Sequence, residues 1–157
     1  MFIAHFFVTK IFFCFVENSL FLQLEFRFMP KKIIVCVDDE KVILTSLISQ
    51  LNNTFGSQYI YEGFSSAEEA WEYIDEVYSE GLTVDLIICD WLMPRIKGDE
   101  FLIRVHKRFP EVKKIMLSGQ ADIDSVEKAK QEANLLKFIS KPWDKDELMS
   151  EVTKALS

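Results

Sequence analysis

The sequence predicts an α/β protein built on a parallel sheet with helices on both faces. From residue 31 onward, short apolar runs alternate with amphipathic segments, and this alternation is typical of parallel sheets. The run at 32–37 is continuous and rich in β-branched residues, as expected for a strand covered on both faces. With 157 residues, the chain is long enough for one domain with a single hydrophobic core.

The apolar runs predict five strands, of which the second, QYIYEGF, has the weakest pattern. The expected strands lie at 32–37, 58–64, 84–89, 113–118 and 136–140. The segments between and after them predict five helices. Apolar residues at helical spacing place the first helix over about 40–53.

A capping box of Ser65 and Glu68 is expected to open the second helix, and Gly81 suits its C-terminal end. The other three are a helix over 99–109 that stops before Pro110, one that begins near Asp122 or Asp124, and one capped by Asp144 with Glu147.

The charge and the cysteines exclude several kinds of site. A formal net charge of -7 argues against non-specific binding to nucleic acid, whose phosphates would repel the protein. Cys14, Cys36 and Cys89 form no CxxC pair and no metal-like spacing. Cys36 and Cys89 lie inside apolar runs, which indicates buried free thiols in a reducing cytoplasm.

Residues 1–28 differ in composition from the rest of the chain. They hold nine of the fourteen phenylalanines and have no clean period. The stretch lacks the charged start and small-residue end of a signal peptide, and it makes a poor membrane span because Lys10, Glu17 and Asn18 interrupt it. We expect Met29 to be the natural start, so that the domain covers 29–157. A membrane or interfacial anchor and an extra packed element are the alternatives.

Polar residues follow four of the expected strands. Asp38 and Asp39 follow the first strand, Asp90 the third, Ser118 ends the fourth, and Lys141 follows the fifth. Because ligands bind outside the carboxyl ends of parallel strands, these residues are expected to share one edge of the sheet. Taken singly, each has a simpler interpretation, as a helix cap, a turn residue or a solvated lysine. Their conjunction favours a site.

The chemistry of this edge suits a phosphoryl group. Clustered carboxylates raise one another's pKa unless a cation joins them, and an oxygen-only set favours Mg²⁺. Lys141 adds a fixed positive charge and Ser118 a hydroxyl donor. Asp90 is a competent nucleophile for an aspartyl-phosphate, and the surrounding charges would stabilise the transferring oxygens.

Four motifs together resemble the receiver domain of two-component response regulators. They are VDDE at 37–40, DWLMP at 90–94 with Gly98 beyond it, LSG at 117–119 and FISKPW at 138–143. The resemblance covers residues 31–156. It implies a flavodoxin-like, doubly wound five-stranded parallel sheet of order 2-1-3-4-5, flanked by five helices.

The resemblance also implies roles for individual residues. The implied site is Asp90 as phosphoacceptor, Lys141 and Ser118 beside the phosphoryl group, and Asp38, Asp39, Asp90 and the backbone carbonyl of Leu92 around Mg²⁺. Ser118 and Phe138 stand at the family's switch positions, and Lys141–Pro142 stands at its cis peptide.

The implied function is a phosphorylation-controlled switch that assists its own phosphorylation and dephosphorylation and is not an enzyme with a separate substrate. A histidine kinase, a phosphotransfer protein or a small phosphodonor would donate the phosphoryl group to Asp90. Phosphorylation would remodel the fourth helix, fifth strand and fifth helix, including Trp143, toward an unknown output partner. The first-helix face around Val42 and Ile43 is our hypothesis for kinase docking, and core packing of the same apolar residues is the alternative.

Two residues depart from the family pattern. Leu92 cannot hydrogen-bond an attacking water, so we expect slow loss of the phosphoryl group, and Leu92→Asn should not slow it further. Phe138 lacks the hydroxyl of a tyrosine, so its rotation would change packing only.

Two other functions are alternatives to the switch. A phosphatase with an aspartate nucleophile needs an acid two residues later, where this chain has Leu92. A degenerate receiver that only binds proteins would not need the complete acidic set. Because the chain stops just after the last helix, we expect no direct binding to DNA, and we expect no membrane association.

Overall fold

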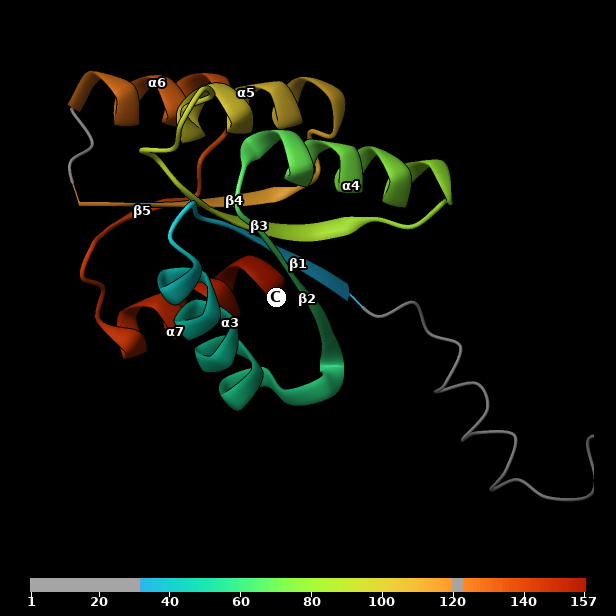
Figure 1. Cartoon of the computed structure of the whole chain (residues 1–157), viewed down its shortest axis with the longest axis vertical. Coiled ribbons are helices and arrows are strands. Elements are labelled where there is room, and N and C mark those ends of the chain that lie inside the picture. Colours follow the sequence, from blue (N-terminus) through green and yellow to red (C-terminus); the bar gives the residue numbers. More distant parts are fainter. Residues whose placement is uncertain (1–31, 120–122) are drawn as a thin grey trace, which may run out of the picture. The chain divides into compact units, whose positions relative to one another are not determined.

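The computed structural model describes residues 32–119 and 123–157 (Figure 1). These residues form a five-stranded parallel sheet of order β2-β1-β3-β4-β5, which confirms the predicted flavodoxin-like order. The strands are β1 (Lys32–Val37), β2 (Tyr59–Phe64), β3 (Val84–Asp90), β4 (Lys113–Ser118) and β5 (Lys137–Ser140).

Five α-helices of the described residues cover the sheet on both faces, as predicted. Figure 1 shows α4, α5 and α6 on one face and α3 and α7 on the other. The helices are α3 (Lys41–Phe55), α4 (Ala67–Ser79), α5 (Gly98–Arg108), α6 (Ile123–Glu132) and α7 (Lys145–Leu156), with a 3-10 turn η1 (Gly56–Gln58) after α3.

The sheet separates two apolar layers because successive strand residues point to opposite faces. In β1, Ile33, Val35 and Val37 pack toward α4, α5 and α6, whereas Ile34 and Cys36 pack toward α3 and α7. Burial of one such aliphatic side chain stabilises the fold by about 1.5–3 kcal/mol. Packing in these two layers therefore holds each strand, and with it the residues at the strand's end, in a fixed position in the sheet.

The start of α4 differs from the sequence prediction by one residue. Ser66, not Ser65, is the N-cap, and its hydroxyl accepts the backbone N–H of Glu69 at 3.2 Å. The Glu69 carboxylate accepts the backbone N–H of Ser65 at 3.3 Å, and Glu68 instead forms an ion pair with Arg95 at 3.5 Å. The predicted Ser65–Glu68 capping box was therefore wrong.

Packing explains this shift, because the core-facing residues Ala67, Ala70, Ile74 and Val77 set the register of α4. The predicted end of the helix is confirmed. Gly81 has a φ of 76° and donates its N–H to the Tyr78 carbonyl at 3.1 Å.

The last helix begins as predicted, with the Asp144 side chain accepting the backbone N–H of Glu147 at 2.9 Å. None of the helices within 32–119 and 123–157 has the length and apolar character that a membrane span requires. The predicted leader, residues 1–28, and the start of the domain at Met29 lie outside the described residues.

Candidate functional site

The carboxyl ends of four strands bring the predicted site residues to one edge of the sheet. Asp38 follows β1, Asp90 ends β3, Ser118 ends β4, and Lys141 follows β5. Backbone hydrogen bonds hold these ends in place. The Lys141 N–H donates to the Ser118 carbonyl at 2.9 Å, and the Asp38 N–H donates to the Phe64 carbonyl at 3.1 Å.

The Lys141 ammonium bridges two buried carboxylates. Its Nζ lies 2.6 Å from Asp38 Oδ2 and 2.6 Å from Asp90 Oδ1. Asp38 is 1% exposed and Asp90 is 5% exposed, so both acids are withdrawn from bulk water. The other oxygen of Asp38 accepts the backbone N–H of Glu40 at 2.9 Å. Asp90, Asp38 and Lys141 therefore form one compact charged cluster.

The contact of Lys141 with two buried acids shifts the pKa of Asp90 and the pKa of Lys141. Burial raises the pKa of Asp90, and the charge of Asp38 adds to this, while the Lys141 ammonium opposes it. Burial lowers the pKa of Lys141, but its bonds to Asp38 and Asp90 outweigh that effect and leave the pKa raised. The lysine is thus a permanent cation beside a carboxylate that is more basic than usual.

A cleft of about 570 Å³ opens onto this cluster. Asp39 is exposed and lines the cleft, whereas Asp38 does not line it. Ser118 is buried and lines the cleft as well. The full lining is Asp39, Glu40, Ile43, Ser46, Gln50, Asp90, Leu92, Ser118, Gly119, Lys141, Pro142 and Trp143.

The oxygen atoms of the acidic residues at this cleft are of the type that binds Mg²⁺. Within the described ranges, no three acidic, histidine or cysteine side chains converge closely enough to enclose a metal by themselves. Mg²⁺ in proteins is commonly held through one or two carboxylates and keeps several waters, so it needs no such cage. Asp90 and Asp39 both line the open cleft, and every nearby acidic ligand is a hard oxygen donor.

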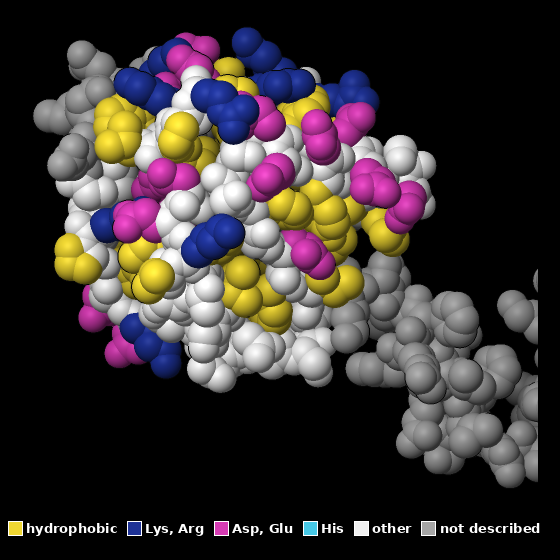
Figure 2. All heavy atoms as spheres, in the orientation of Figure 1, with side chains coloured by type: hydrophobic (Ala, Val, Ile, Leu, Met, Phe, Trp, Pro, Cys, Tyr) yellow, Lys and Arg dark blue, Asp and Glu magenta, His cyan; other side chains and the backbone are white. Residues whose placement is uncertain are grey.

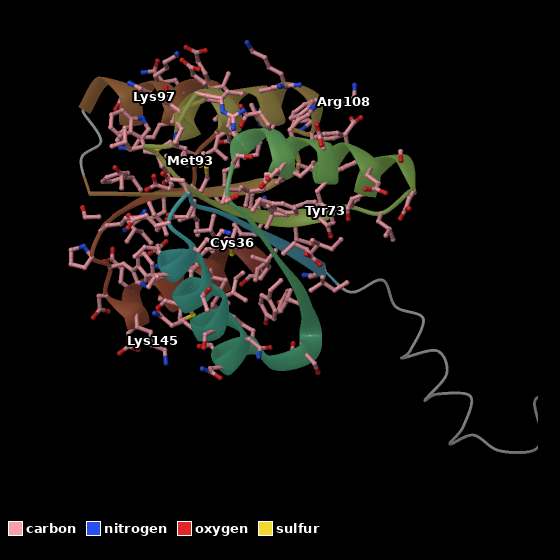
Figure 3. The ribbon with its side chains drawn as sticks, viewed as in Figure 1. Cys36, Tyr73, Met93, Lys97, Arg108 and Lys145 are labelled. Atoms are coloured by element: carbon pink, nitrogen blue, oxygen red, sulfur yellow. The ribbon has the colours of Figure 1, made fainter. Side chains whose placement is uncertain are left out.

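The residue after Asp90 is held at several points that sequence reasoning did not identify. The Trp91 carbonyl accepts the N–H of Gly98 at 2.8 Å, and its indole N–H donates to the buried Asp99 carboxylate at 3.1 Å. The Lys97 ammonium lies 4.9 Å from the Trp91 ring centroid. Lys97 is exposed in the loop between β3 and α5 and is labelled in Figure 3. The motif marked Gly98, but the sequence carried no signal for the Trp91–Asp99 bond.

The far wall of the cleft joins α3 to the segment after β5. Trp143 Nε1 donates to Gln50 Oε1 at 3.2 Å, a contact across 93 positions that the sequence did not suggest. The Lys141–Pro142 peptide bond is cis. Phe138 is half-buried on β5, opposite Met116 of β4. Val42, at the start of α3, is 81% exposed, and Leu92 is 52% exposed.

Comparison with known proteins is consistent with this architecture. Residues 34–153 match the family model of the response regulator receiver domain. The hydrogenase transcriptional regulatory protein HoxA of Cupriavidus necator is 32% identical over 123 residues, covering 78% of this chain and 24% of HoxA. The DNA-binding transcriptional regulator NtrC of Azospirillum brasilense is 30% identical over 129 residues, covering 82% of this chain and 25% of NtrC. The chain thus spans about a quarter of either regulator.

Solved structures show the same fold. The signal receiver domain of an HD domain-containing protein from Pseudomonas fluorescens Pf-5 has a TM-score of 0.70 at 29% identity, over 80% of this chain and 94% of that one. A CheY-like receiver domain protein from Methanospirillum hungatei JF-1 has a TM-score of 0.68 at 30% identity, over 80% and 93%. By sequence and by fold, the chain belongs to the response regulator receiver domain family, whose members are signalling modules.

Proposed function

We propose that this protein is a phosphorylation-controlled switch whose phosphoacceptor is Asp90. The observation that carries the proposal is the Lys141 ammonium, 2.6 Å from both Asp90 and Asp38 at the end of an open cleft. A fixed cation beside a carboxylate of raised pKa favours both attack on phosphorus and retention of the charged product.

In the proposed reaction, a carboxylate oxygen of Asp90 attacks the phosphorus of a phosphohistidine on a kinase or phosphotransfer protein. The phosphorus–nitrogen bond breaks, its electron pair returns to the donor imidazole, and an aspartyl-phosphate forms. Lys141 then pairs with a phosphoryl oxygen, and the Ser118 hydroxyl donates to another. The protein assists its own modification by positioning and charge.

Asp38, Asp39, Asp90 and the backbone carbonyl of Leu92 are the groups that we assign to Mg²⁺. When bound, the ion would offset negative charge on the transferring oxygens. The chain's own contribution is to hold these acids at one strand edge, with Asp38 oriented by the Glu40 N–H at 2.9 Å.

The cleft supplies the route for the donor histidine. Its rim carries Ile43 from α3 and Leu92, and the adjacent Val42 is 81% exposed. We assign the α3 face around Val42 and Ile43 to donor docking, because an apolar surface next to the cleft suits a helix of the donor protein.

The switch itself is assigned to Ser118 and Phe138. Movement of Ser118 toward the phosphoryl group would leave space that Phe138 fills, and this would shift the surface of α6, β5 and α7, including Trp143. Because Phe138 has no hydroxyl, we expect its rotation to act through packing. That surface is the proposed contact for the output partner.

The phosphorylated state is expected to be long-lived. Leu92 is 52% exposed at the mouth of the cleft and offers no group to orient an attacking water. Leu92→Asn should therefore leave the rate of hydrolysis unchanged or raise it, as followed by loss of the phosphoryl adduct over time. Slower hydrolysis in this variant would contradict the assignment.

The deciding experiment is intact mass after incubation with acetyl phosphate, with and without Mg²⁺. We expect one phosphoryl adduct on the wild type in Mg²⁺, and none on Asp90→Asn or without the metal. An adduct that persists in Asp90→Asn would place the phosphoacceptor elsewhere.

Absence of the adduct in a folded, Mg²⁺-binding wild type is tested next with a phosphohistidine donor. Failure with both donors would favour a protein-binding module without phosphorylation. The proposed setting is the cytoplasm, supported by two buried unpaired thiols, Cys36 and Cys89. Regulators such as NtrC bind DNA, but for the present chain we propose protein partners only.

A further inference from the structure

One helix, α4, carries acidic side chains without any basic ones. The chain has a net charge of -7, and α4 with the residue after it holds six carboxylates and no Lys or Arg. These carboxylates belong to Glu68, Glu69, Glu72, Asp75, Glu76 and Glu80. Two of them are paired from the α5 side, Glu68 with Arg95 at 3.5 Å and Asp75 with Arg108 at 2.8 Å.

Next to this helix lies a half-exposed aromatic surface. The rings of Phe64, on the edge strand β2, and Tyr73, on α4, lie 5.0 Å apart. Ile60, also on β2, is 37% exposed. In Figure 2, carboxylates surround a hydrophobic patch at the place where Figure 3 labels Tyr73, while Lys and Arg side chains gather over α5 and α6. We call Ile60, Phe64, Tyr73 and the acids around Tyr73 the β2–α4 surface.

Three carboxylates surround Tyr73 from two elements. Burial raises the pKa of Tyr73, and the charges of Glu62, Glu76 and Glu80 raise it further. Among the residues that the structure describes, no Lys or Arg forms an ion pair with any of these three acids. Glu76 and Glu80 are also spaced to repel each other at one end of α4. The ring therefore faces a concentrated and uncompensated negative charge.

We propose that the β2–α4 surface binds a basic segment of a partner protein, one that presents Lys or Arg beside an apolar side chain. A cation can lie against the Tyr73 ring face, and aromatic rings attract cations within about 6 Å of the centroid. Glu62, Glu76 and Glu80 supply the opposite charge, and Ile60 with Phe64 supplies an apolar contact. Charge complementarity thus sets both the sign and the mixed character of the occupant.

A second copy of the chain fits this surface less well. The Arg104 guanidinium already lies 3.8 Å from the Trp71 ring centroid, and Arg108 is paired with Asp75. Two cations of the α5 face are therefore engaged within their own molecule. No residue of the β2–α4 surface lines the cleft at Asp90, so this contact is separate from phosphoryl transfer.

The test is a nitrogen-15 NMR titration of the full chain with a blocked peptide of sequence Arg-Leu-Lys-Leu-Arg. We expect the largest shift changes at Ile60, Glu62, Phe64 and Tyr73, and weaker binding at higher salt. A peptide with glutamine in place of the basic residues should not bind. Absence of binding, or shifts centred on Asp39 and Asp90, would overturn the proposal.

Two charge variants separate a built surface from general attraction to an acidic protein. The triple variant Glu62→Gln, Glu76→Gln, Glu80→Gln should weaken binding roughly tenfold, as expected for the loss of three ion pairs at the surface, two with exposed acids and one with the half-buried Glu62. The matched variant Glu100→Gln, Glu127→Gln, Glu132→Gln removes the same charge from exposed positions on α5 and α6 and should bind as the wild type does. Equal weakening in both variants would contradict the proposal.

Discussion

Gly98 packs against the backbone of Asp90, the proposed phosphoacceptor, so closely that there is no room for a larger side chain. A Cβ atom built on Gly98 would overlap the backbone carbonyl oxygen of Asp90 and lie 2.9 Å from the Cα of Trp91. Backbone atoms cannot rotate away as a side chain does, so the loop after β3 would have to move. The Gly98 N–H, which donates to the Trp91 carbonyl at 2.8 Å, would be displaced with it.

We therefore expect Gly98→Ala to lower the free energy of unfolding by about 2 kcal/mol and to slow phosphorylation by acetyl phosphate. Urea unfolding measures the first effect and intact mass the second. Gly119→Ala is the control for stability, because its Cβ would meet nothing closer than 3.9 Å. If Gly98→Ala had the same free energy of unfolding as the wild type, the loop after β3 would be able to move without loss of stability, contrary to the prediction.

Lys114 is a fully buried lysine without a carboxylate partner among the described residues. Its Nζ donates to the Val112 carbonyl at 2.6 Å and lies 3.2 Å from His106 Nδ1. Burial lowers the pKa of Lys114 to about 8, against the effect of Glu111, and Lys113 lowers it further. In the unfolded chain the pKa of a lysine is about 10.4.

The sign of the resulting pH dependence follows from proton binding. Below pH 8 both states are protonated, and the full penalty for burying the cation is present. Between about 8 and 10.4 the unfolded chain holds the proton that the folded protein has released, so the free energy of unfolding rises with pH. Lys114→Met lacks this rise.

The measurement is the difference in unfolding free energy between Lys114→Met and the wild type, from urea titrations across this pH range. We expect the difference to shift by about 2 kcal/mol in favour of the wild type between pH 7 and pH 10. Its sign at pH 7 also reflects the lost bond to Val112, so the shift is the informative quantity. Parallel pH profiles would contradict a lowered pKa for Lys114.

At the scale of one element, the N-cap of α4 can be tested by mutation. Ser66 caps the helix through the Glu69 N–H at 3.2 Å, whereas Ser65 contacts only the Glu69 side chain. Ser66→Ala should lower the free energy of unfolding by about 1 kcal/mol, and Ser65→Ala by less. Urea unfolding of both variants gives the comparison. A larger loss in Ser65→Ala would restore the capping box expected from the sequence.

The same helix shows where sequence reasoning reached its limit. The pattern S-S-A-E-E allows either serine to cap, and the local motif alone cannot distinguish them. The choice depends on which residues meet the sheet, and Ala67, Ala70 and Ile74 decide it. Strands were easier to place, because continuous apolar runs such as the one in β1 leave little choice of boundary.

At the scale of the whole molecule, topology made the cluster at Lys141 predictable. Once the strands are parallel, the residues at their carboxyl ends must share an edge, and Asp38, Asp90 and Lys141 do so. Contacts that depend on side-chain packing across distant segments were out of reach. The Gln50–Trp143 bond and the burial of Lys114 are of this kind.

The whole fold should also respond to occupation of the Asp90 site. Beryllium fluoride with Mg²⁺ resembles a phosphoryl group on a carboxylate, and a ligand that binds only the folded state raises stability by mass action. At a concentration about 100 times the dissociation constant, the gain is about 2.7 kcal/mol, or a rise in Tm of about 5 °C or more.

Thermal unfolding of the full chain measures this rise, with Asp90→Asn as the matched control. The variant keeps the size of the side chain and the adjacent Asp38 but loses the carboxylate that would hold beryllium, so we expect no rise beyond that given by Mg²⁺ alone. Equal rises in both proteins would mean that the ligand binds away from Asp90. A rise confined to the wild type would link the buried cluster at Lys141 to the stability of the entire sheet, because the strand ends that it joins are those of β1, β3 and β5.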